Sequence, residues 1–182
     1  MKSSLVIVLF LAAGIAGGWY IIKQNHPQIG NFKLKDVLQI SSPVIPNNGI
    51  IPDKYTCSGL NLSPELNFWS VPSEAKSLAL IMEDTDAPSG SYIHWVIYNM
   101  PPSTTRIAEA GNPPGTVARN GNNVRAYTGP CPPTGEHRYH FTLYALDEIL
   151  SDGSIYGKAD LAVAMKGHIL DHAEMVGRYK KK

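Results

Sequence analysis

Acidic residues and a histidine surround a tight turn in the middle of the chain. Glu83, Asp84 and Asp86 end an apolar stretch, an Ala-Pro-Ser-Gly turn follows, and His94 comes soon after it. Because side chains alternate along a strand, Asp84 and Asp86 are expected to point to one side, where a return strand brings His94 beside them. A hydrogen bond to an aspartate would then fix the tautomer of His94 and leave its other nitrogen for a ligand. The alternative interpretation is a capped turn without a chemical role.

A second stretch, residues 129–139, reads Gly-Pro-Cys-Pro-Pro-Thr-Gly-Glu-His-Arg-Tyr and is expected to lie beside the first. Its prolines exclude a helix or a central strand, so we expect a rigid loop that forms the wall of a pocket. On the strand that follows, His137 and Tyr139 face one way, whereas Arg138 faces the other way and is predicted to form a structural ion pair. A tyrosine hydroxyl, a histidine and loop N–H groups suit a phosphate or sulfate ligand.

Catalysis and metal binding are less well supported than ligand binding. A hydrolase that uses Asp84 with His94 is one alternative, but the chain has no Gly-x-Ser-x-Gly nucleophile turn. His168 and His172 are four positions apart on a predicted helix, without the acidic motif of a zinc protease between them. We therefore expect a protein that is not an enzyme, with no metal site and no cofactor.

The elements that position these residues are predicted to be mostly β-strands. The chain contains 16 glycines and 14 prolines, which separate short alternating or apolar stretches with turns. Helical spacing predicts one helix over residues 159–172, before a closing strand over 175–179. This order predicts a mainly β, antiparallel sandwich with a small helical cover. The other predicted strands are residues 36–42, 65–70, 77–82, 93–100, 106–109 and 139–146.

The N-terminal segment predicts export. Residues 5–22 contain no charged residue and end in Trp19-Tyr20-Ile21-Ile22, which suits a membrane-spanning anchor. A signal peptide cleaved near Gly14-Ile15-Ala16 is the alternative. We therefore predict a signal-anchor or signal peptide over 1–22, a polar stalk over 23–35 and a folded domain over 36–182. The domain is expected outside the cytoplasm, on a single-pass anchor or secreted after cleavage.

The charge of the chain argues against one class of partner. Charged residues make up 17% of the chain and the formal net charge is +1. A broad basic surface is the usual requirement for nucleic-acid binding, so we expect no nucleic-acid partner.

Cys57 and Cys131 both flank the predicted pocket. A disulfide between them could persist outside the cytoplasm. It would close a loop of about 75 residues and stabilise the fold by roughly 4 kcal/mol. Two buried free thiols, or a reactive thiol at Cys131, remain alternatives.

These motifs resemble the signature blocks of the phosphatidylethanolamine-binding protein family, and most of all its bacterial and archaeal Raf-kinase-inhibitor-like branch. The blocks are Asp84-x-Asp86-Ala87-Pro88 with His94, and the 129–139 stretch. Residues 55–64 and 167–174 resemble the same branch, and the likeness runs in consistent order over about residues 36–180. The resemblance implies an antiparallel Greek-key-type β-sandwich with a small anion-binding pocket at one end.

The resemblance also implies a function and a set of site residues. Family pockets accept phosphate, acetate or phosphoethanolamine-like groups, and members regulate kinase pathways or flowering or inhibit serine proteases. We therefore expect an exported module that binds a small anionic or phosphorylated ligand and regulates a partner enzyme, a protease or a kinase. An extracellular serine protease inhibitor is the alternative. The implied ligand-binding residues are Asp84, His94, Gly129, Pro132, Pro133, His137 and Tyr139, and the supporting residues are Asp86, Pro88 and Arg138.

The chain departs from the animal members of the family at two positions. Thr85 replaces the proline between the acids, and Cys131 stands at a glycine-like position of the loop. Of the two aspartates, Asp84 is the better candidate for the pocket, while Asp86, just before the Ala-Pro turn, is predicted to serve the turn itself.

Overall fold

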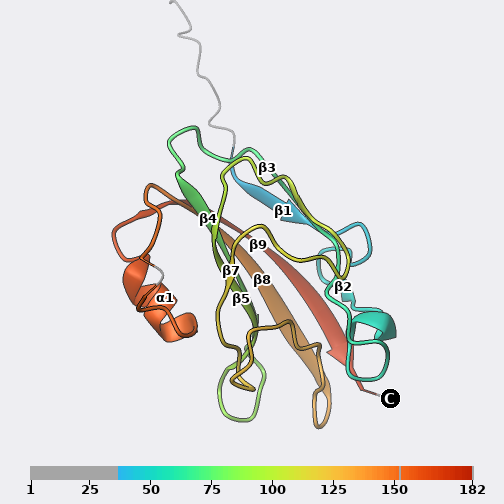
Figure 1. Ribbon diagram of the computed structural model, residues 1–182. Coiled ribbons are helices and arrows are strands. Elements are labelled where there is room, and N and C mark those ends of the chain that lie inside the picture. The colour runs from blue at the N-terminus through green and yellow to red at the C-terminus, as the bar shows by residue number, and fades with distance from the viewer. Residues whose placement is uncertain (1–36, 152, 182) are drawn as a thin grey trace, which may run out of the picture. The chain divides into compact units, whose positions relative to one another are not determined.

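The structure is a computed structural model in which residues 37–151 and 153–181 are described. Within these residues the chain forms nine strands, one α-helix and one 3₁₀ turn (Figure 1). The strands are β1 (Gln39–Ser41), β2 (Gly49–Ile50), β3 (Leu66–Trp69), β4 (Ser77–Asp84), β5 (Tyr92–Met100), β6 (Arg106–Ile107), β7 (Thr116–Val117), β8 (Glu136–Leu146) and β9 (Ile169–Lys180). The helix is α1 (Lys158–Ala164), and the 3₁₀ turn spans Asp53–Tyr55. The mainly β prediction is confirmed, and each predicted strand has a counterpart.

The strands form a main sheet in the order β2-β9-β8-β4-β5-β7 and a small sheet in the order β1-β3-β6. Neighbouring strands run antiparallel, except that β2 pairs with β9 in parallel. The amide of Asn48 donates to the carbonyl of Val176, and the amide of Ile51 donates to that of Arg178. The backbone on either side of β2 therefore hydrogen-bonds to the edge of β9. This parallel pairing makes the main sheet mixed rather than wholly antiparallel.

The main sheet is buried on both faces, which explains why β4 and β5 are nearly continuous in apolar residues. The small sheet packs on one face, and α1 with its flanking chain packs on the other (Figure 1). The first core includes Ile40, Leu66, Phe68, Leu80, Met82, Phe141 and Leu143. The second includes Ile81, Val96, Tyr98, Leu161 and Met165. The central strands therefore form a rigid layer on which a site at their ends can be held.

The helix predicted over residues 159–172 is wrong in its length. α1 ends at Ala164, and β9 already begins at Ile169. Gly167 lies between them with φ of +87°, a conformation that favours glycine and commonly ends a helix. The apolar residues after Gly167 therefore continue as a strand that pairs with β8 along its whole length.

The two histidines of that segment consequently do not share a helical face. His168 lies in the turn before β9, with Nδ1 2.9 Å from Asp147 Oδ1 and Nε2 3.0 Å from Glu148 Oε2. His172 lies on β9 and stacks on the ring of Tyr144. Among the described residues no group of histidine, cysteine and acidic side chains could hold a metal ion.

The predicted export segments lie outside the described residues. These are the signal-anchor or signal peptide over residues 1–22 and the stalk over 23–35. Within residues 37–151 and 153–181, no helix combines the length and the apolar character needed to cross a bilayer.

The backbone conformation at Gly167 gives a test of the boundary between α1 and β9. Gly167→Ala should lower the free energy of unfolding by about 1–2 kcal/mol, because an L residue in the left-handed region costs roughly that much. Gly153→Ala is the matched control, since nothing lies within 4 Å of an added Cβ and its φ is not in that region. Urea unfolding of both variants measures the difference. Equal stability of the two would contradict this account of the boundary.

Candidate functional site

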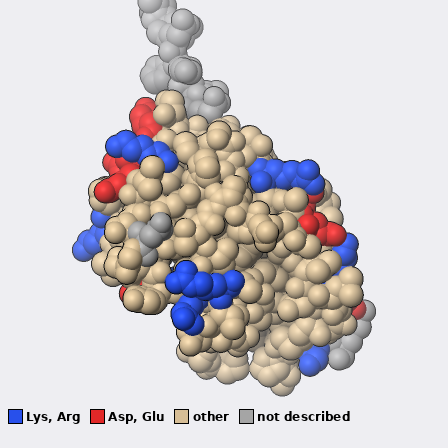
Figure 2. Space-filling view, in the orientation of Figure 1, with Lys and Arg blue, Asp and Glu red and all other residues tan. Residues whose placement is uncertain are grey.

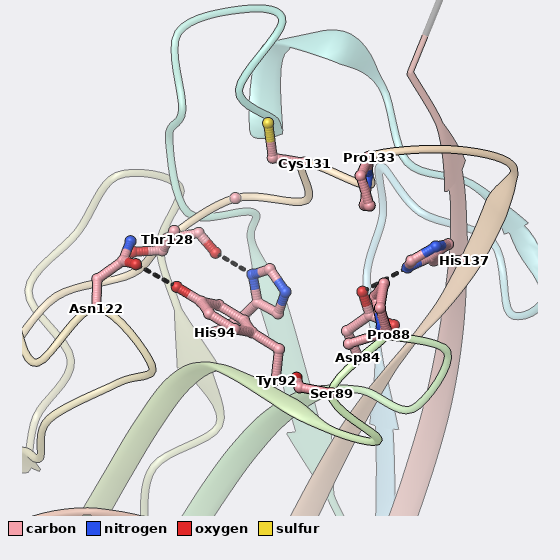
Figure 3. Close-up of a pocket in the computed structure, with 12 residues that line it drawn as sticks. Asp84, Pro88, Ser89, Tyr92, His94, Asn122, Thr128, Cys131, Pro133 and His137 are labelled. Carbon is pink, nitrogen blue, oxygen red and sulfur yellow. Dashed lines mark hydrogen bonds and ion pairs between the residues drawn. The ribbon is translucent and has the colours of Figure 1, made fainter.

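A cavity of about 320 Å³ opens at one end of the main sheet (Figure 3). Its walls come from the ends of β4, β5 and β8, the turn that follows β4, and the loop that precedes β8. Five of the seven residues implied as ligand-binding line it, and so does the supporting residue Pro88. The five are Asp84, His94, Gly129, Pro133 and His137.

The other two implied ligand-binding residues lie behind the cavity wall. Pro132 is buried and does not line the cavity. Tyr139 is 0% exposed, and its ring packs edge-on against His94 with centroids 5.2 Å apart. Its hydroxyl has no hydrogen-bond partner, and burial together with the nearby Asp84 carboxylate raises the pKa of Tyr139. Tyr139 therefore packs against the ring of His94 from behind the cavity wall and does not line the cavity itself.

Asp84 forms its histidine pair with His137, so the expected pair with His94 is wrong. Nδ1 of His137 lies 2.8 Å from Oδ2 of Asp84, and both side chains are buried. A carboxylate can only accept, so Nδ1 carries the proton and Nε2 is left for a ligand. The other carboxylate oxygen accepts the amide of Asp86 at 2.9 Å. β4 lies between β5 and β8, and Asp84 is in register with Tyr92 on β5 and with Tyr139 on β8. Both histidine strands therefore flank Asp84, and the ring of His94 bonds to the Thr128 carbonyl instead.

His94 instead bonds to the backbone of the loop before β8. Its Nδ1 lies 2.6 Å from the carbonyl oxygen of Thr128, which accepts the ring proton. The side chain is 4% exposed, and burial lowers the pKa of His94, although Thr128 and Asp84 partly oppose this shift. The ring is therefore neutral near pH 7, with an Nε2 that can accept a hydrogen bond but cannot donate one.

Asp86 points away from the cavity and binds Arg138. Its Oδ2 accepts from the amide and Nε of Arg138 at 2.9 and 2.8 Å, and its Oδ1 accepts from Nη2 at 2.6 Å. The predicted structural ion pair of Arg138 is thus confirmed, and the role of Asp86 in the turn stays a prediction. The chain leaves the alternation of β4 after Asp84, which separates the two aspartates.

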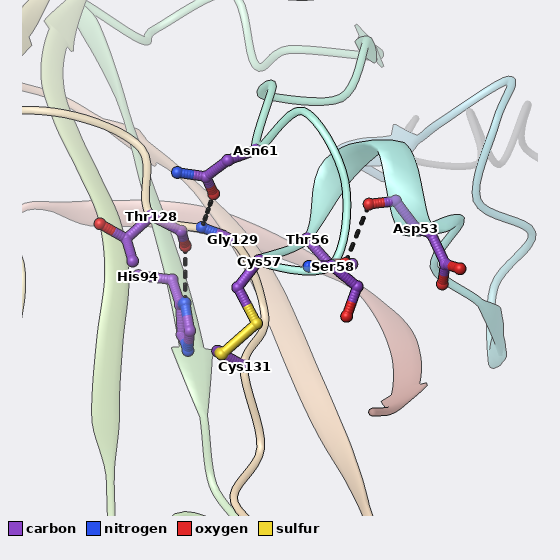
Figure 4. The surroundings of a disulfide bond; sticks show 9 residues. All are labelled: Asp53, Thr56, Cys57, Ser58, Asn61, His94, Thr128, Gly129 and Cys131. Atoms are coloured by element: carbon purple, nitrogen blue, oxygen red, sulfur yellow. Dashed lines mark hydrogen bonds between the residues drawn. A yellow bond between two sulfur atoms is a disulfide. The ribbon is translucent and has the colours of Figure 1, made fainter. Parts of the chain in front are cut away.

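The wall formed by residues 127–133 is docked on the loop that contains Cys57 (Figure 4). The amide of Gly129 donates to Oδ1 of Asn61 at 2.7 Å, and the amide of Cys57 donates to the carbonyl of Pro130 at 3.1 Å. A Cβ on Gly129 would lie 2.5 Å from the carbonyl oxygen of Tyr55, so only glycine allows this approach. Gly129 therefore has a structural reason to be glycine, independent of any ligand.

A disulfide joins the same two loops. Cys57 and Cys131 are bonded, with Cα atoms 5.4 Å apart, and Cys131 lines the cavity. The predicted disulfide is therefore present in the structure, and the free-thiol alternatives do not apply to it. The covalent link holds the cavity wall against the 3₁₀ turn and the chain that follows it.

The docking of the wall changes the expected donors of the pocket. Loop N–H groups were expected to bind an anion, but the Gly129 amide is taken by Asn61, and Pro130, Pro132 and Pro133 have no N–H. The cavity wall from 129 to 133 therefore offers the amide of Cys131 alone. His94 and His137 therefore become the main candidates for contacts with an anion.

Four further residues line the cavity that the motif reasoning missed. Ser89 comes from the turn, and Thr128 belongs to the wall. The hydroxyl of Tyr92 donates to Oδ1 of Asn122 at 2.5 Å, and the ring of Tyr92 lies 4.8 Å from that of His94. Alternation along the strand could have placed Tyr92 beside His94. Asn122 carried no such signal, because it lies in a Gly- and Asn-rich segment without periodicity.

Comparisons with known proteins agree with this arrangement. The sequence profile of the phosphatidylethanolamine-binding protein family matches residues 41–180. A UPF0098 protein of Methanothermobacter thermautotrophicus is 45% identical over 150 residues, which cover 79% of this chain and 99% of that relative.

Solved structures show the same likeness. The crystal structure of CT736, a phosphatidylethanolamine-binding protein homologue of Chlamydia trachomatis, has a TM-score of 0.78 and 41% identity, covering 81% of this chain and 99% of that one. The structure of E. coli YbcL has a TM-score of 0.74 and 26% identity, covering 80% and 99%. The profile match extends from the end of β1 to the end of β9 and includes the whole cavity.

The ion pair of Asp86 predicts a pH-dependent stability. The hydrogen bonds from Arg138 lower the pKa of Asp86 below its ordinary value in the folded state. The stabilisation is therefore fully present above the unfolded pKa of about 3.9 and is lost as the pH falls toward the lower folded value. Relative to Asp86→Asn, the native protein should keep a constant advantage above about pH 5 and lose it progressively as the pH falls below about 4. Urea unfolding across this range tests it, and an advantage that does not change with pH would contradict the ion pair.

The disulfide predicts a large and specific loss of stability. Replacing both cysteines, Cys57→Ser with Cys131→Ser, should lower the free energy of unfolding by about 4 kcal/mol, because the open loop gains entropy in the unfolded chain. Native protein prepared without reductant should show no reactive thiol after denaturation. Two thiols per chain under these conditions would show that the bond does not form.

Proposed function

Because this chain belongs to the bacterial and archaeal branch of the phosphatidylethanolamine-binding protein family, we propose that its pocket binds a small anionic or phosphorylated group. The observation that carries the proposal is the arrangement of the two histidines. His94 lies on one side of the cavity and the Asp84–His137 pair on the other (Figure 3). Each Nδ1 is held by a fixed acceptor, which leaves both Nε2 atoms for a group bound between them.

The size of the cavity favours a head group over a whole lipid. A volume of about 320 Å³ is at the lower end of the range for small-molecule sites. Ala87, Pro88 and Pro133 give it apolar walls, which suit the carbon atoms next to a charged group. Phosphate itself and small phosphate monoesters such as phosphoethanolamine are the ligands of this size and polarity.

We propose binding without turnover. An activated nucleophile needs a base within hydrogen-bond reach. Within the described residues no hydroxyl hydrogen-bonds to His94 or His137, and the hydroxyl of Tyr92 is directed to Asn122. This supports a binding site over a hydrolase built on Asp84.

We further propose that the protein acts outside the cytoplasm, anchored by residues 1–22 or released from them, and regulates a partner enzyme. The disulfide supports this compartment, because such bonds persist mainly in oxidising surroundings. On the face shown in Figure 2, the basic side chains of the described residues lie in separate small groups. That distribution favours a small ligand or a protein partner over nucleic acid.

A ligand titration followed by NMR tests the proposal. Phosphate and phosphoethanolamine should shift the imidazole signals of His94 and His137 with millimolar or tighter affinity. Asp84→Ala should weaken binding at least about tenfold, equivalent to 1.4 kcal/mol, because His137 loses the acceptor that orients it.

Asp147→Ala is the matched control, since Asp147 forms a similar aspartate–histidine pair with His168 away from the cavity. It should bind both ligands as the native protein does. Imidazole signals that do not move at tenfold higher ligand concentration would refute the binding role. Equal affinity of the Asp84 and Asp147 variants would refute the role of Asp84.

A further inference from the structure

We propose that the pocket binds its acidic ligand together with one proton, held between a ligand oxygen and Nε2 of His94. This inference rests on the anion-binding function proposed above and narrows its ligand class. The preferred ligand is then a singly protonated acid group, such as the monoanion of a phosphate monoester or a phosphonate. A fully ionised group binds only when His94 takes up a proton from solution.

The direction of the His94 ring is fixed by its backbone partner. Its Nδ1 proton is donated to the Thr128 carbonyl, an acceptor that belongs to the docked wall and cannot donate in return. Neutral His94 therefore presents a lone pair at Nε2 toward the cavity. A fully ionised phosphate or sulfate also presents only lone pairs. Such a contact is repulsive unless one proton lies between the two atoms.

The described lining of the cavity carries no permanent positive charge. The cavity is lined by no lysine or arginine among the described residues. The Gly129 amide and the Tyr92 hydroxyl already have acceptors, in Asn61 and Asn122. The remaining donors are neutral, so a charge that balances the ligand has to come from an imidazole or from a proton that the ligand carries.

The two imidazoles of the cavity differ in the partners of their Nδ1 atoms. His137 already faces a carboxylate, that of Asp84, whereas His94 bonds to a neutral carbonyl. His94 has no negative hydrogen-bond partner until the ligand supplies one, so we assign the added proton to its Nε2.

The other groups around His94 do not prevent its ring from taking up a proton when an anion binds. β4 contributes Asp84, which favours the protonated ring, and β8 contributes His137, which opposes it. β8 also contributes Tyr139, and His94's own strand contributes Tyr92, whose rings contact it. In the wall, Cys131 is in the disulfide and the hydroxyl of Tyr127 donates to the carbonyl of Tyr55, so neither supplies a charge to His94. Burial holds the pKa of free His94 low, and the bound anion would raise it.

Calorimetry with sulfate tests the proposal, because sulfate carries no proton of its own at neutral pH. Titrations in two buffers with different heats of ionisation count the protons taken up. At about pH 7.5 we expect an uptake of about one proton per sulfate, and an affinity that falls about tenfold for each further unit of pH. His94→Gln should bind sulfate without this uptake, and His168→Gln, the control outside the cavity, should retain it.

The outcomes separate this inference from the function on which it rests. Binding without proton uptake, or uptake that persists in His94→Gln, would overturn the inference and leave the anion site intact. If neither sulfate nor phosphate binds at any pH, the proposed function fails as well. If His94→Gln does not fold, the NMR signals of the imidazole nitrogens in the native protein provide the test. Sulfate should then convert Nε2 of His94 from unprotonated to protonated, and an unchanged nitrogen signal would refute the proposal.

Discussion

The hydrogen bond from His94 to the carbonyl of Thr128 determines the chemistry of this pocket. It fixes the ring proton on Nδ1 and leaves Nε2 directed at a cavity that no described lysine or arginine lines. The Asp84–His137 pair does the same for the second imidazole from the opposite wall. The proposed ligand class, its proposed protonation state and the proposed pH dependence of binding all rest on these two hydrogen bonds.

The position of the Thr128 carbonyl depends in turn on contacts far away in the sequence. Gly129 packs on the backbone of Tyr55 and donates to Asn61, and the disulfide joins Cys131 to Cys57. These contacts hold in place a proline-rich wall whose backbone has few N–H groups that could donate hydrogen bonds. A pocket built this way is preorganised, because the ordering of the wall is completed on folding rather than on binding.

Features that depend on neighbouring residues could be predicted from the sequence, whereas contacts between distant segments could not. Side-chain alternation or proline content predicts the strands, the acidic turn, the wall and the ion pair of Arg138. No such pattern identifies the partner of Asp84, because β5 and β8 both pair with β4 at this residue. The choice of His137 goes with the bond of His94 to the distant Thr128 carbonyl. The helix was overextended because apolar spacing alone does not register the backbone conformation of Gly167. The use of the Gly129 amide by Asn61 is a contact between distant loops, which no local pattern contains.

The most direct test is the tautomer of His94 in the ligand-free protein, read from the nitrogen signals of its imidazole by long-range ¹H–¹⁵N NMR. The account predicts a neutral ring at about pH 7.5, with the proton on Nδ1 and Nε2 bare. A proton on Nε2 would contradict it, because the ring would then offer an anion a donor without any uptake of protons.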